Sequence, residues 1–275
     1  MQKDVAVVIG VGGMGLAIAR RVASGRRVVL ADFNEATLEA AAAQLTGDGH
    51  DVLTRRVDVS DRTSVAELAD AAAAAGRVTH VAHTAGLSPM QAPTQAILAV
   101  DLLGVAHVLD EFPRVIAPGG SGVVISSMSA YFAAPTLPAE LGAALATTPT
   151  DDLLALPFLA ALPNPGAAYS IAKRANQLRV AAASVAWGEA GARINSISPG
   201  VISTPMGQEE LAGDSGEQMR GMVAASAAKR LGTPDDIAAA AAFLLDPQVA
   251  SFISGVDLLV DGGTVAGVNA RGLLG

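Results

Sequence analysis

The chain has 275 residues, of which 51% are hydrophobic and only 3% aromatic, and its formal net charge is −8. A chain of this length can bury a large core, and its acidic balance disfavours nucleic acid and anionic membranes as partners. It contains no cysteine, which excludes disulfides and thiolate sites, and its four histidines lack metal-ligand spacing. Neither a signal peptide nor an apolar run of roughly 18 residues is recognisable, so we expect a cytoplasmic globular protein without a metal site.

Short β-branched runs alternate with alanine-rich helical patterns along the chain. The predicted elements, in chain order, are strand 5–9, helix 13–24, strand 28–30, helix 35–45, strand 52–57, helix 61–75, strand 78–82, helix 94–112, strand 123–126, helix 167–189, strand 193–197, helix 234–245 and strand 256–260. This alternation predicts right-handed crossovers, and nearly continuous apolar strands fit a sheet that is covered on both faces. We therefore predict one α/β domain over residues 1–275, with a Rossmann-type doubly wound parallel sheet of about seven strands.

Two long stretches interrupt the alternation. Residues 131–166 are rich in Ala, Leu and Pro, and residues 203–230 contain three methionines and several glycines. Both leave the carboxyl ends of predicted strands, where open α/β sheets bind their ligands. We expect the apolar insertion at 131–166 and a substrate lid at 203–230 to wall a hydrophobic pocket. The alternative is that the insertion packs against a partner subunit.

A glycine-rich turn follows the first strand and opens the first helix. Gly10, Gly12 and Gly15 match the pattern Gly-x-Gly-x-x-Gly, in which the backbone can approach a pyrophosphate at a helix N terminus. The second strand ends at Asp32, 17 residues after Gly15 (32 − 15), where a carboxylate can accept hydrogen bonds from a ribose 2′-hydroxyl. Neither the turn nor the two residues after Asp32 offer a cation for a 2′-phosphate, so NAD(H) is predicted in preference to NADP(H). An ordinary tight turn and a helix-capping Asp32 are the alternatives.

Tyr169 and Lys173 lie four residues apart in a predicted helix and therefore on one helix face. A free tyrosine has a pKa near ~10 and is a poor base at neutral pH. A fixed cation beside it favours the phenolate and lowers that pKa. The pair is thus a candidate proton donor and acceptor for alcohol–carbonyl chemistry, although the same spacing also arises by chance.

Six motifs occur in a characteristic order. They are Asp58-Val59, His83-Thr84-Ala85-Gly86, Ile125-Ser126-Ser127-Met128, Tyr169-x-x-x-Lys173, Pro199-Gly200-Val201-Ile202-Ser203-Thr204 and Asp261-Gly262-Gly263. In this order the chain resembles the short-chain dehydrogenase/reductase family over almost its full length. It looks most similar to the bacterial 3α-hydroxysteroid dehydrogenase/carbonyl reductase branch, because of the short connection from Gly86 to Asp101, the insertion before Tyr169 and the run at 186–191.

The resemblance implies a reversible hydride transfer between an alcohol carbon and a nicotinamide cofactor. It implies that Tyr169 exchanges a proton with the substrate, that Lys173 lowers the pKa of Tyr169 and holds the nicotinamide ribose, and that Ser127 hydrogen-bonds the substrate oxygen. The neighbouring Ser126 leaves open which serine acts. The cofactor-binding residues implied are Gly10, Gly13, Met14, Gly15, Asp32, Phe33, Asp58, Val59, Thr84, Ala85, Gly86, Tyr169, Lys173, Pro199, Gly200, Val201 and Thr204.

Two residues depart from the family's pattern. Asp101 stands where the family often has Asn, and its charge could pair with Lys173, hold the lysine protonated and weaken its effect on Tyr169. His83 stands where the family usually has Asn, and a structural role is expected for it. Three residues separate Tyr169 from Lys173, whereas enoyl reductases of the superfamily have a wider gap, which disfavours reduction of a carbon–carbon double bond.

We therefore predict an NAD(H)-dependent oxidoreductase that interconverts a secondary alcohol and a ketone, with a bulky apolar, steroid-like substrate. One alternative is a non-catalytic NAD-binding regulatory protein on the same scaffold, which only Asp101 favours. Another is a sugar epimerase or dehydratase, although such relatives usually carry an additional C-terminal sugar domain. The resemblance also implies a homodimer or a homotetramer.

Overall fold

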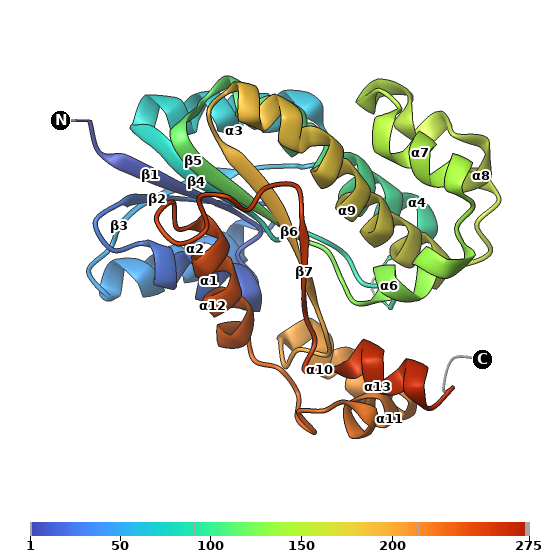
Figure 1. Ribbon diagram of the computed structural model, residues 1–275. Coiled ribbons are helices and arrows are strands. Elements are labelled where there is room, and N and C mark those ends of the chain that lie inside the picture. The colour runs from blue at the N-terminus through green and yellow to red at the C-terminus, as the bar shows by residue number, and fades with distance from the viewer. Residues whose placement is uncertain (1, 91, 214, 273–275) are drawn as a thin grey trace.

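The structure is a computed structural model that describes residues 2–90, 92–213 and 215–272. Within these residues seven strands form one sheet, in which all neighbouring strands run parallel. They are β1 (Asp4–Ile9), β2 (Arg27–Asp32), β3 (Asp51–Arg56), β4 (Arg77–His83), β5 (Ile116–Ile125), β6 (Arg193–Pro199) and β7 (Asp257–Val260). Their order across the sheet is β3-β2-β1-β4-β5-β6-β7 (Figure 1). The order reverses between β1 and β4, which confirms the predicted doubly wound sheet and marks the ligand-binding crevice.

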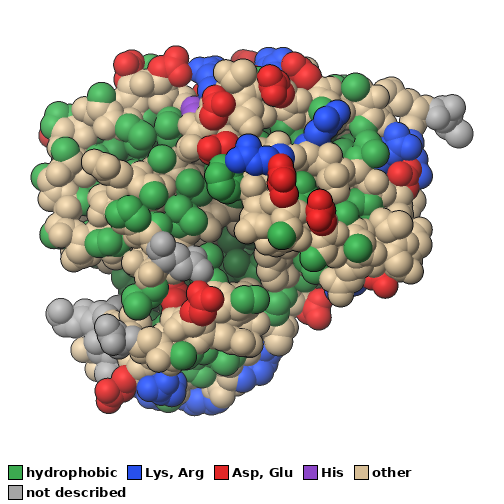
Figure 2. Space-filling model, turned by 180° about the vertical axis from the view of Figure 1, so that it is seen from behind, with side chains coloured by type: hydrophobic (Ala, Val, Ile, Leu, Met, Phe, Trp, Pro, Cys, Tyr) green, Lys and Arg blue, Asp and Glu red, His purple; other side chains and the backbone are tan. Residues whose placement is uncertain are grey.

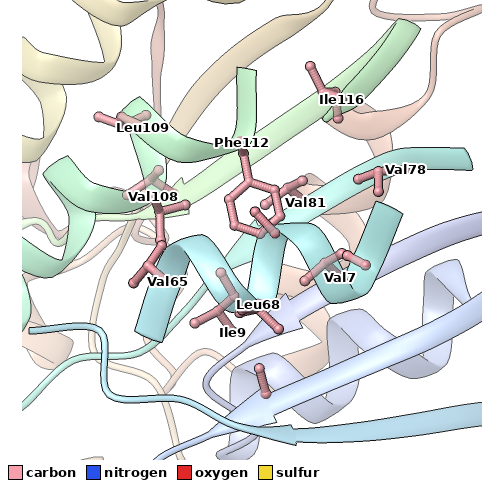
Figure 3. Close-up of a cluster of buried hydrophobic side chains, with 14 of the residues drawn as sticks. Val7, Ile9, Val65, Leu68, Val78, Val81, Val108, Leu109, Phe112 and Ile116 are labelled. Atoms are coloured by element: carbon pink, nitrogen blue, oxygen red, sulfur yellow. The ribbon is translucent and has the colours of Figure 1, made fainter. Parts of the chain in front are cut away.

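Helices cover both faces of the sheet (Figure 1). One face carries α1 (Gly13–Val22), α2 (Glu35–Gly47) and α12 (Pro234–Leu245), and the other carries α3 (Arg62–Ala75), α5 (Gly104–Glu111) and α9 (Pro165–Glu189). Ala6 and Val8 of β1 pack with the first group, whereas Val7 and Ile9 pack with the second. Figure 3 shows the second core, where Phe112 lies among side chains of α3 and the strands. Two buried faces explain why the strands are apolar almost throughout.

The helix predicted over 94–112 is interrupted in the structure. It consists of α4 (Thr94–Ile97), a π-helical stretch η1 (Leu98–Leu103) and α5, followed by a 3₁₀ turn η2 (Phe112–Arg114). Single π-helical turns occur frequently at functional sites, and this one contains Asp101. The strand predicted at 123–126 is also longer, because β5 begins at Ile116 and turns at Gly119, whose φ is 82°.

The insertion at 131–166 folds into short helices that pack on α9. They are the end of α6 (Ser129–Ala133), then η3 (Ala134–Thr136), α7 (Ala139–Thr147), η4 (Thr150–Ala155) and α8 (Pro157–Ala160). Leu145, Leu153 and Leu159 are buried in a third core together with η1 and α9. The prediction that the insertion walls a substrate pocket is wrong for these three leucines, because they fill the space beneath the insertion.

Arg179 of α9 holds this insertion in place. Its Nη1 donates to the carbonyls of Leu145 at 3.1 Å and Thr148 at 2.9 Å, and its Nη2 donates to Thr150 Oγ1 at 3.1 Å. Arg179→Lys keeps the charge but loses the planar fork, so we expect the free energy of unfolding to fall by about 1–3 kcal/mol. Urea unfolding followed by circular dichroism measures the change.

The exposed Arg21 provides a matched control for this substitution. Arg21→Lys makes the same chemical change on the surface, where we expect it to alter the free energy of unfolding by less than ~0.5 kcal/mol. If Arg179→Lys costs no more than this control, the hydrogen bonds of Arg179 do not anchor the insertion.

The lid predicted at 203–230 forms two helices. Thr204 caps α10 (Pro205–Ala212), since its Oγ1 accepts a hydrogen bond from Gly207 N at 3.1 Å, and α11 (Gly216–Ala225) follows. With α13 (Thr264–Ala270) they form a lobe at the bottom of Figure 1. Figure 2 shows the surface hollowed between this lobe and the main body. In the described part of the chain no helix combines the length and apolarity needed to cross a membrane.

Candidate active site

The glycine turn leaves the N terminus of α1 open to a ligand. A Cβ on Gly10 would lie 2.4 Å from Ala85 N, and one on Gly15 would lie 1.9 Å from the Gly10 carbonyl oxygen, so both glycines are needed for close packing. A Cβ on Gly12 would meet nothing within 4 Å, and no side chain among the described residues caps α1. The first backbone N–H groups of α1 therefore have no side-chain cap among the described residues, which fits the pyrophosphate of a dinucleotide.

Asp32 closes one side of this turn. Its Oδ2 accepts a hydrogen bond from Val11 N at 2.8 Å, and its Oδ1 accepts one from Asn34 N at 2.9 Å. Asp32 pairs in register with Arg56 of β3, and the Arg56 guanidinium lies 4.5 Å from the centroid of the exposed Phe33 ring. No cation near Asp32 is apparent in the local sequence, because Arg56 approaches Asp32 and Phe33 from the neighbouring strand β3. The register of β2 against β3 is the signal that identifies it.

The loop segments after β3 and β4 converge on the same edge of the sheet. Asp58 accepts hydrogen bonds from the backbone and the hydroxyl of Ser60, and Val59 packs against Gly104 at the start of α5. Thr84 Oγ1 donates to the Gly10 carbonyl at 2.6 Å and so joins this edge to the glycine turn.

Gly86, in the loop after β4, lies between this edge of the sheet and Lys173. A Cβ on Gly86 would lie 3.2 Å from both Asp101 Oδ2 and Lys173 Nζ. The predicted dinucleotide residues of the first four strands therefore lead directly to the Tyr169–Lys173 helix.

The loop after β6 reaches the glycine turn from the other side. A Cβ on Gly13 would lie 3.1 Å from Thr204 Cγ2, and one on Gly200 would lie 2.7 Å from Asp261 Cα. Pro199 is the last residue of β6, and Val201 is buried. The structure thus brings the predicted residues of this loop to the same end of the sheet as the turn. Met14 follows at the first turn of α1 and is half-buried.

Tyr169 and Ser127 meet at the carboxyl end of β5. Asn164 caps α9 by accepting a hydrogen bond from Ala167 N, which starts the helix that carries Tyr169. Burial is the main influence on the pKa of Tyr169, and among the smaller ones the Ser127 hydroxyl lowers it. Ser126 Oγ instead donates to the Lys173 carbonyl at 2.7 Å and is buried, so only Ser127 presents its hydroxyl to the phenol. This favours Ser127 over Ser126 as the serine of the site.

Asp101 and Lys173 form a buried ion pair beneath Tyr169. Asp101 Oδ2 lies 3.2 Å from Lys173 Nζ, with side-chain exposures of 0% and 5%. Asp101 Oδ1 accepts a hydrogen bond from Leu87 N at 2.7 Å, and Lys173 Nζ donates to the Ile125 carbonyl at 3.4 Å. The same ammonium lies 5.3 Å from the centroid of the Tyr169 ring. The direct pairing considered from the sequence is therefore present.

Burial and charge set the pKa values of these groups. Burial lowers the pKa of Lys173, but the charges of Asp101 and Tyr169 together with the hydrogen bond to Asp101 outweigh it, so the net pKa lies above its ordinary value. Burial raises the pKa of Asp101, which Lys173 and the Leu87 N–H oppose. Because Oδ1 accepts from an amide while Oδ2 faces an ammonium, the geometry is that of a carboxylate opposite a cation.

The pKa of the Tyr169 phenol is affected by both members of the Asp101–Lys173 ion pair. Burial raises the pKa of Tyr169, Lys173 opposes this shift, and Asp101 adds to it, so that the net pKa lies above its ordinary value. Lys173 acts in the predicted direction, but burial and Asp101 outweigh it.

Two further side chains complete the surroundings. His83 is 1% exposed, and burial, followed by the charge of Lys173, lowers its pKa to about 3. It is therefore a neutral, buried histidine, as the sequence analysis expects. Glu210 of α10 is half-buried, burial raises its pKa, and its charge makes a small contribution to the raised pKa of Tyr169. No sequence signal marks Glu210, because only the folded lid brings it near the phenol. Within the described residues no group of three or more His, Asp or Glu side chains could hold a metal ion.

The glycine turn and the strand-end loops form a dinucleotide-binding site beside the Tyr169–Lys173 pair. This combination is typical of nicotinamide-dependent oxidoreductases. A family model described as enoyl-(acyl carrier protein) reductase matches residues 10–146 and 155–265. The short-chain dehydrogenase/reductase bsc3 of Alternaria brassicicola is 41% identical over 267 residues, which cover 97% of each chain. The chain belongs to the short-chain dehydrogenase/reductase family and is an oxidoreductase.

A second relative and a solved structure agree with this assignment. The cis-4-hydroxycyclohexanecarboxylate dehydrogenase of Sinomonas cyclohexanicum is 32% identical over 273 residues, which cover 95% of this chain and 96% of the relative. A short-chain dehydrogenase/reductase from Serratia marcescens BCRC 10948 has a TM-score of 0.74 at 24% identity, covering 96% of this chain and 98% of that one. At this identity the structural likeness concerns the fold.

Proposed function

We propose that the chain is an NAD(H)-dependent dehydrogenase that interconverts a secondary alcohol and a ketone. The observation that carries the proposal is the Tyr169 ring, whose centroid lies 5.3 Å from the buried Lys173 ammonium, with Ser127 following the strand β5. A screen of secondary alcohols with NAD⁺ and of ketones with NADH, followed by the absorbance of NADH, tests it. Turnover of none of these compounds by the folded, nucleotide-binding protein would refute it.

Each side chain of the site has one proposed task. When bound, the nicotinamide accepts or supplies the hydride. Tyr169 takes the alcohol proton in oxidation and returns it in reduction, and Ser127 donates a hydrogen bond to the substrate oxygen. Lys173, held as an ammonium by Asp101, stabilises the phenolate form of Tyr169. The N terminus of α1 and the loop that ends at Thr204 hold the cofactor.

Asp32 is the basis for proposing NAD(H) in preference to NADP(H). A carboxylate at this strand end accepts hydrogen bonds from a ribose diol and repels a 2′-phosphate. Asp32→Asn keeps an oxygen for the Val11 amide and removes the charge, so we expect the preference for NADH over NADPH to fall about 10- to 100-fold. Calorimetric titration with both nucleotides measures the ratio.

The exposed Asp48 offers the control for this experiment, since it pairs with Arg20 on the surface. Asp48→Asn removes the same charge and is expected to leave the nucleotide preference unchanged. An unchanged preference in Asp32→Asn as well would contradict the assignment of specificity to Asp32. Arg56 would then be the residue to test next, because it places a cation beside the Phe33 ring.

The proposed substrate is a compact alicyclic secondary alcohol. A bulky, steroid-like substrate is predicted from the apolar insertion, but the leucines Leu145, Leu153 and Leu159 are buried against other elements, which removes part of that support. The name of the Sinomonas relative describes a six-membered ring with a secondary alcohol. Steroids belong in the same substrate screen, and a preference for them would restore the likeness to the 3α-hydroxysteroid dehydrogenase branch.

Two other activities are less well supported. Reduction of an enoyl thioester follows from the description of the family model, but the spacing of Tyr169 and Lys173 disfavours it. A non-catalytic role rests on Asp101, which instead pairs with Lys173. A homodimer or homotetramer in the cytoplasm is proposed from the family resemblance, and light scattering after size exclusion distinguishes the two assemblies.

A further inference from the structure

Two buried side chains near Lys173, those of His83 and Asn176, have polar atoms without a protein partner. His83 is 1% exposed and Asn176 is 0% exposed. Neither ring nitrogen of His83 and neither amide atom of Asn176 makes a hydrogen bond within the described residues. Burying an imidazole or an amide without hydrogen bonds is unfavourable, and such groups in native proteins are paired with the protein or with ordered water. Both side chains therefore need a partner that the described part of the chain does not supply.

Comparable side chains elsewhere in the fold are satisfied. Asn195 of β6 is also 0% exposed, but its two amide atoms form hydrogen bonds with the backbone at 2.9 Å and 3.1 Å. The buried His107 has its Nδ1 3.0 Å from the Val59 carbonyl. The unpaired groups of His83 and Asn176 are thus no general property of buried histidine and asparagine in this fold.

Strand register and helix periodicity place both groups against the same core. His83 ends β4 and pairs in register with Val124 of β5, which packs in the core shown in Figure 3. Asn176 follows Lys173 by about one turn of α9 and precedes Val180 of that core by another. The serine–carbonyl hydrogen bond described above holds α9 over the end of β5 at this level. The imidazole and the amide therefore approach each other from β4 and α9, below the buried ion pair.

We propose that an internal water molecule bridges His83 and Asn176, and that this bridge positions the Lys173 ammonium beneath Tyr169. A buried water makes about three hydrogen bonds, and a neutral imidazole and an amide each offer both a donor and an acceptor. Buried ion pairs need further hydrogen bonds around them, which this bridge supplies next to Lys173. His83 and Asn176 act as positioning residues, since their effect on the chemistry passes through the ammonium.

The electrostatics of His83 agree with this placement. Burial, then the charge of Lys173, lower the pKa of His83, while the Gly104 backbone raises it without making a hydrogen bond to either ring nitrogen. The ring is therefore neutral at physiological pH and keeps one nitrogen as an acceptor for a water O–H. Only the kinetic test below rests on the proposed dehydrogenase function.

Matched variants of the full-length protein separate this role from packing. Asn176→Leu has a similar branched shape but no polar atom, whereas Asn176→Ser keeps a hydroxyl and leaves room for water. His83→Leu and His83→Asn form the second apolar and polar pair. The control is Asn195→Leu, which removes an equally buried amide whose partners are all backbone groups. Circular dichroism and NADH titration check that each variant folds and binds the cofactor.

The first measurement is a high-resolution crystal structure of the wild type. We expect ordered water within hydrogen-bond distance of both the His83 ring and the Asn176 amide. A direct hydrogen bond between the two side chains, or no water between them, would overturn the proposal. This measurement needs no turnover, so it decides the inference even if no alcohol is oxidised or a leucine variant does not fold.

The second measurement is the pH–rate profile of alcohol oxidation with NAD⁺. Lys173 lowers the pKa of Tyr169 against burial, Asp101 and Glu210, so a misplaced ammonium should raise that pKa. We expect the profile of Asn176→Leu to move to higher pH by about one unit, which lowers kcat about 10-fold below the pKa.

The other variants complete this kinetic test. His83→Leu should move the profile in the same direction, whereas Asn176→Ser and His83→Asn should restore the wild-type position. Asn195→Leu should lose stability without any shift. A loss of rate at every pH without a shift, or an equal shift in the control, would show a packing role only and overturn the proposal. Oxidation of no secondary alcohol by the wild type would instead remove the proposed function.

Discussion

Replacing Tyr169 with Phe is expected to lower kcat for alcohol oxidation by about 10²- to 10⁴-fold, the usual contribution of a general acid–base group. The substitution removes only the hydroxyl that is proposed to exchange the proton with the substrate. The ring remains, so its packing in the third core and its position above Lys173 should be preserved. Steady-state kinetics with NAD⁺ and a responsive alcohol measure the loss, and NADH titration shows whether the cofactor still binds.

The chain offers a matched control, because Tyr131 is its only other tyrosine. The Tyr131 hydroxyl donates to Asp257 Oδ2 at 2.9 Å, in a polar network beside β7. Tyr131→Phe therefore deletes the same atom outside the proposed proton path, and kcat should stay within about 2-fold while stability falls by about 1 kcal/mol. If both variants lose activity equally, the effect of Tyr169→Phe is structural. If Tyr169→Phe keeps full activity, another group transfers the proton.

The sheet and the cofactor edge could be predicted because local sequence determines them. Strands buried on both faces require unbroken apolar runs, and helices that return the chain require the alternation seen along it. Gly10 and Gly15 can be identified because packing at the turn tolerates no side chain. Asp32 follows from its place at the end of β2, where it binds the amide of the turn.

Features that depend on packing between distant segments could not be predicted in the same way. The leucines of the insertion are apolar whether they line a pocket or fill a core, and only the fold shows that Leu145 packs against η1 and α9. Arg56 reaches Phe33 from a neighbouring strand. Whether the pKa of Tyr169 is raised or lowered also depends on burial, and the spacing of Tyr169 and Lys173 in the sequence does not reveal how deeply the phenol is buried.

Replacing Asp101 with Asn is expected to move the pH–rate profile of alcohol oxidation to lower pH. In the proposed mechanism Tyr169 is the base for oxidation, so the rate should rise with pH as the phenol loses its proton. Burial and then the Asp101 charge keep the pKa of Tyr169 high, against the effect of Lys173. The amide retains an oxygen for the Leu87 N–H but carries no charge, so the pKa of Tyr169 should fall at every pH at which Lys173 stays protonated. An unchanged profile would show that Asp101 does not control the phenol.

The same substitution should also destabilise the fold, because it leaves the buried Lys173 ammonium without its anion. Removing one partner of a buried pair costs about 3–5 kcal/mol. In the wild type the folded pKa of Lys173 lies above its ordinary value of 10.5. The stabilisation that this shift contributes is therefore present below pH 10.5 and is lost as pH rises through the folded pKa. In Asp101→Asn the charge of Asp101 no longer opposes the effect of burial, so the folded pKa of Lys173 drops. The difference in unfolding free energy between the wild type and the variant should therefore be largest near neutral pH and become smaller towards alkaline pH.

Thermal unfolding across this pH range, with the exposed Asp70→Asn as control, separates the two roles of Asp101. The control pair with Arg114 lies on the surface and should contribute less than ~1 kcal/mol at any pH. A purely structural Asp101 would produce the pH-dependent loss of stability without any shift in the pH–rate profile. A positioning residue that acts through Lys173 on Tyr169 must produce both, because the same charge stabilises the ammonium and opposes ionisation of the phenol.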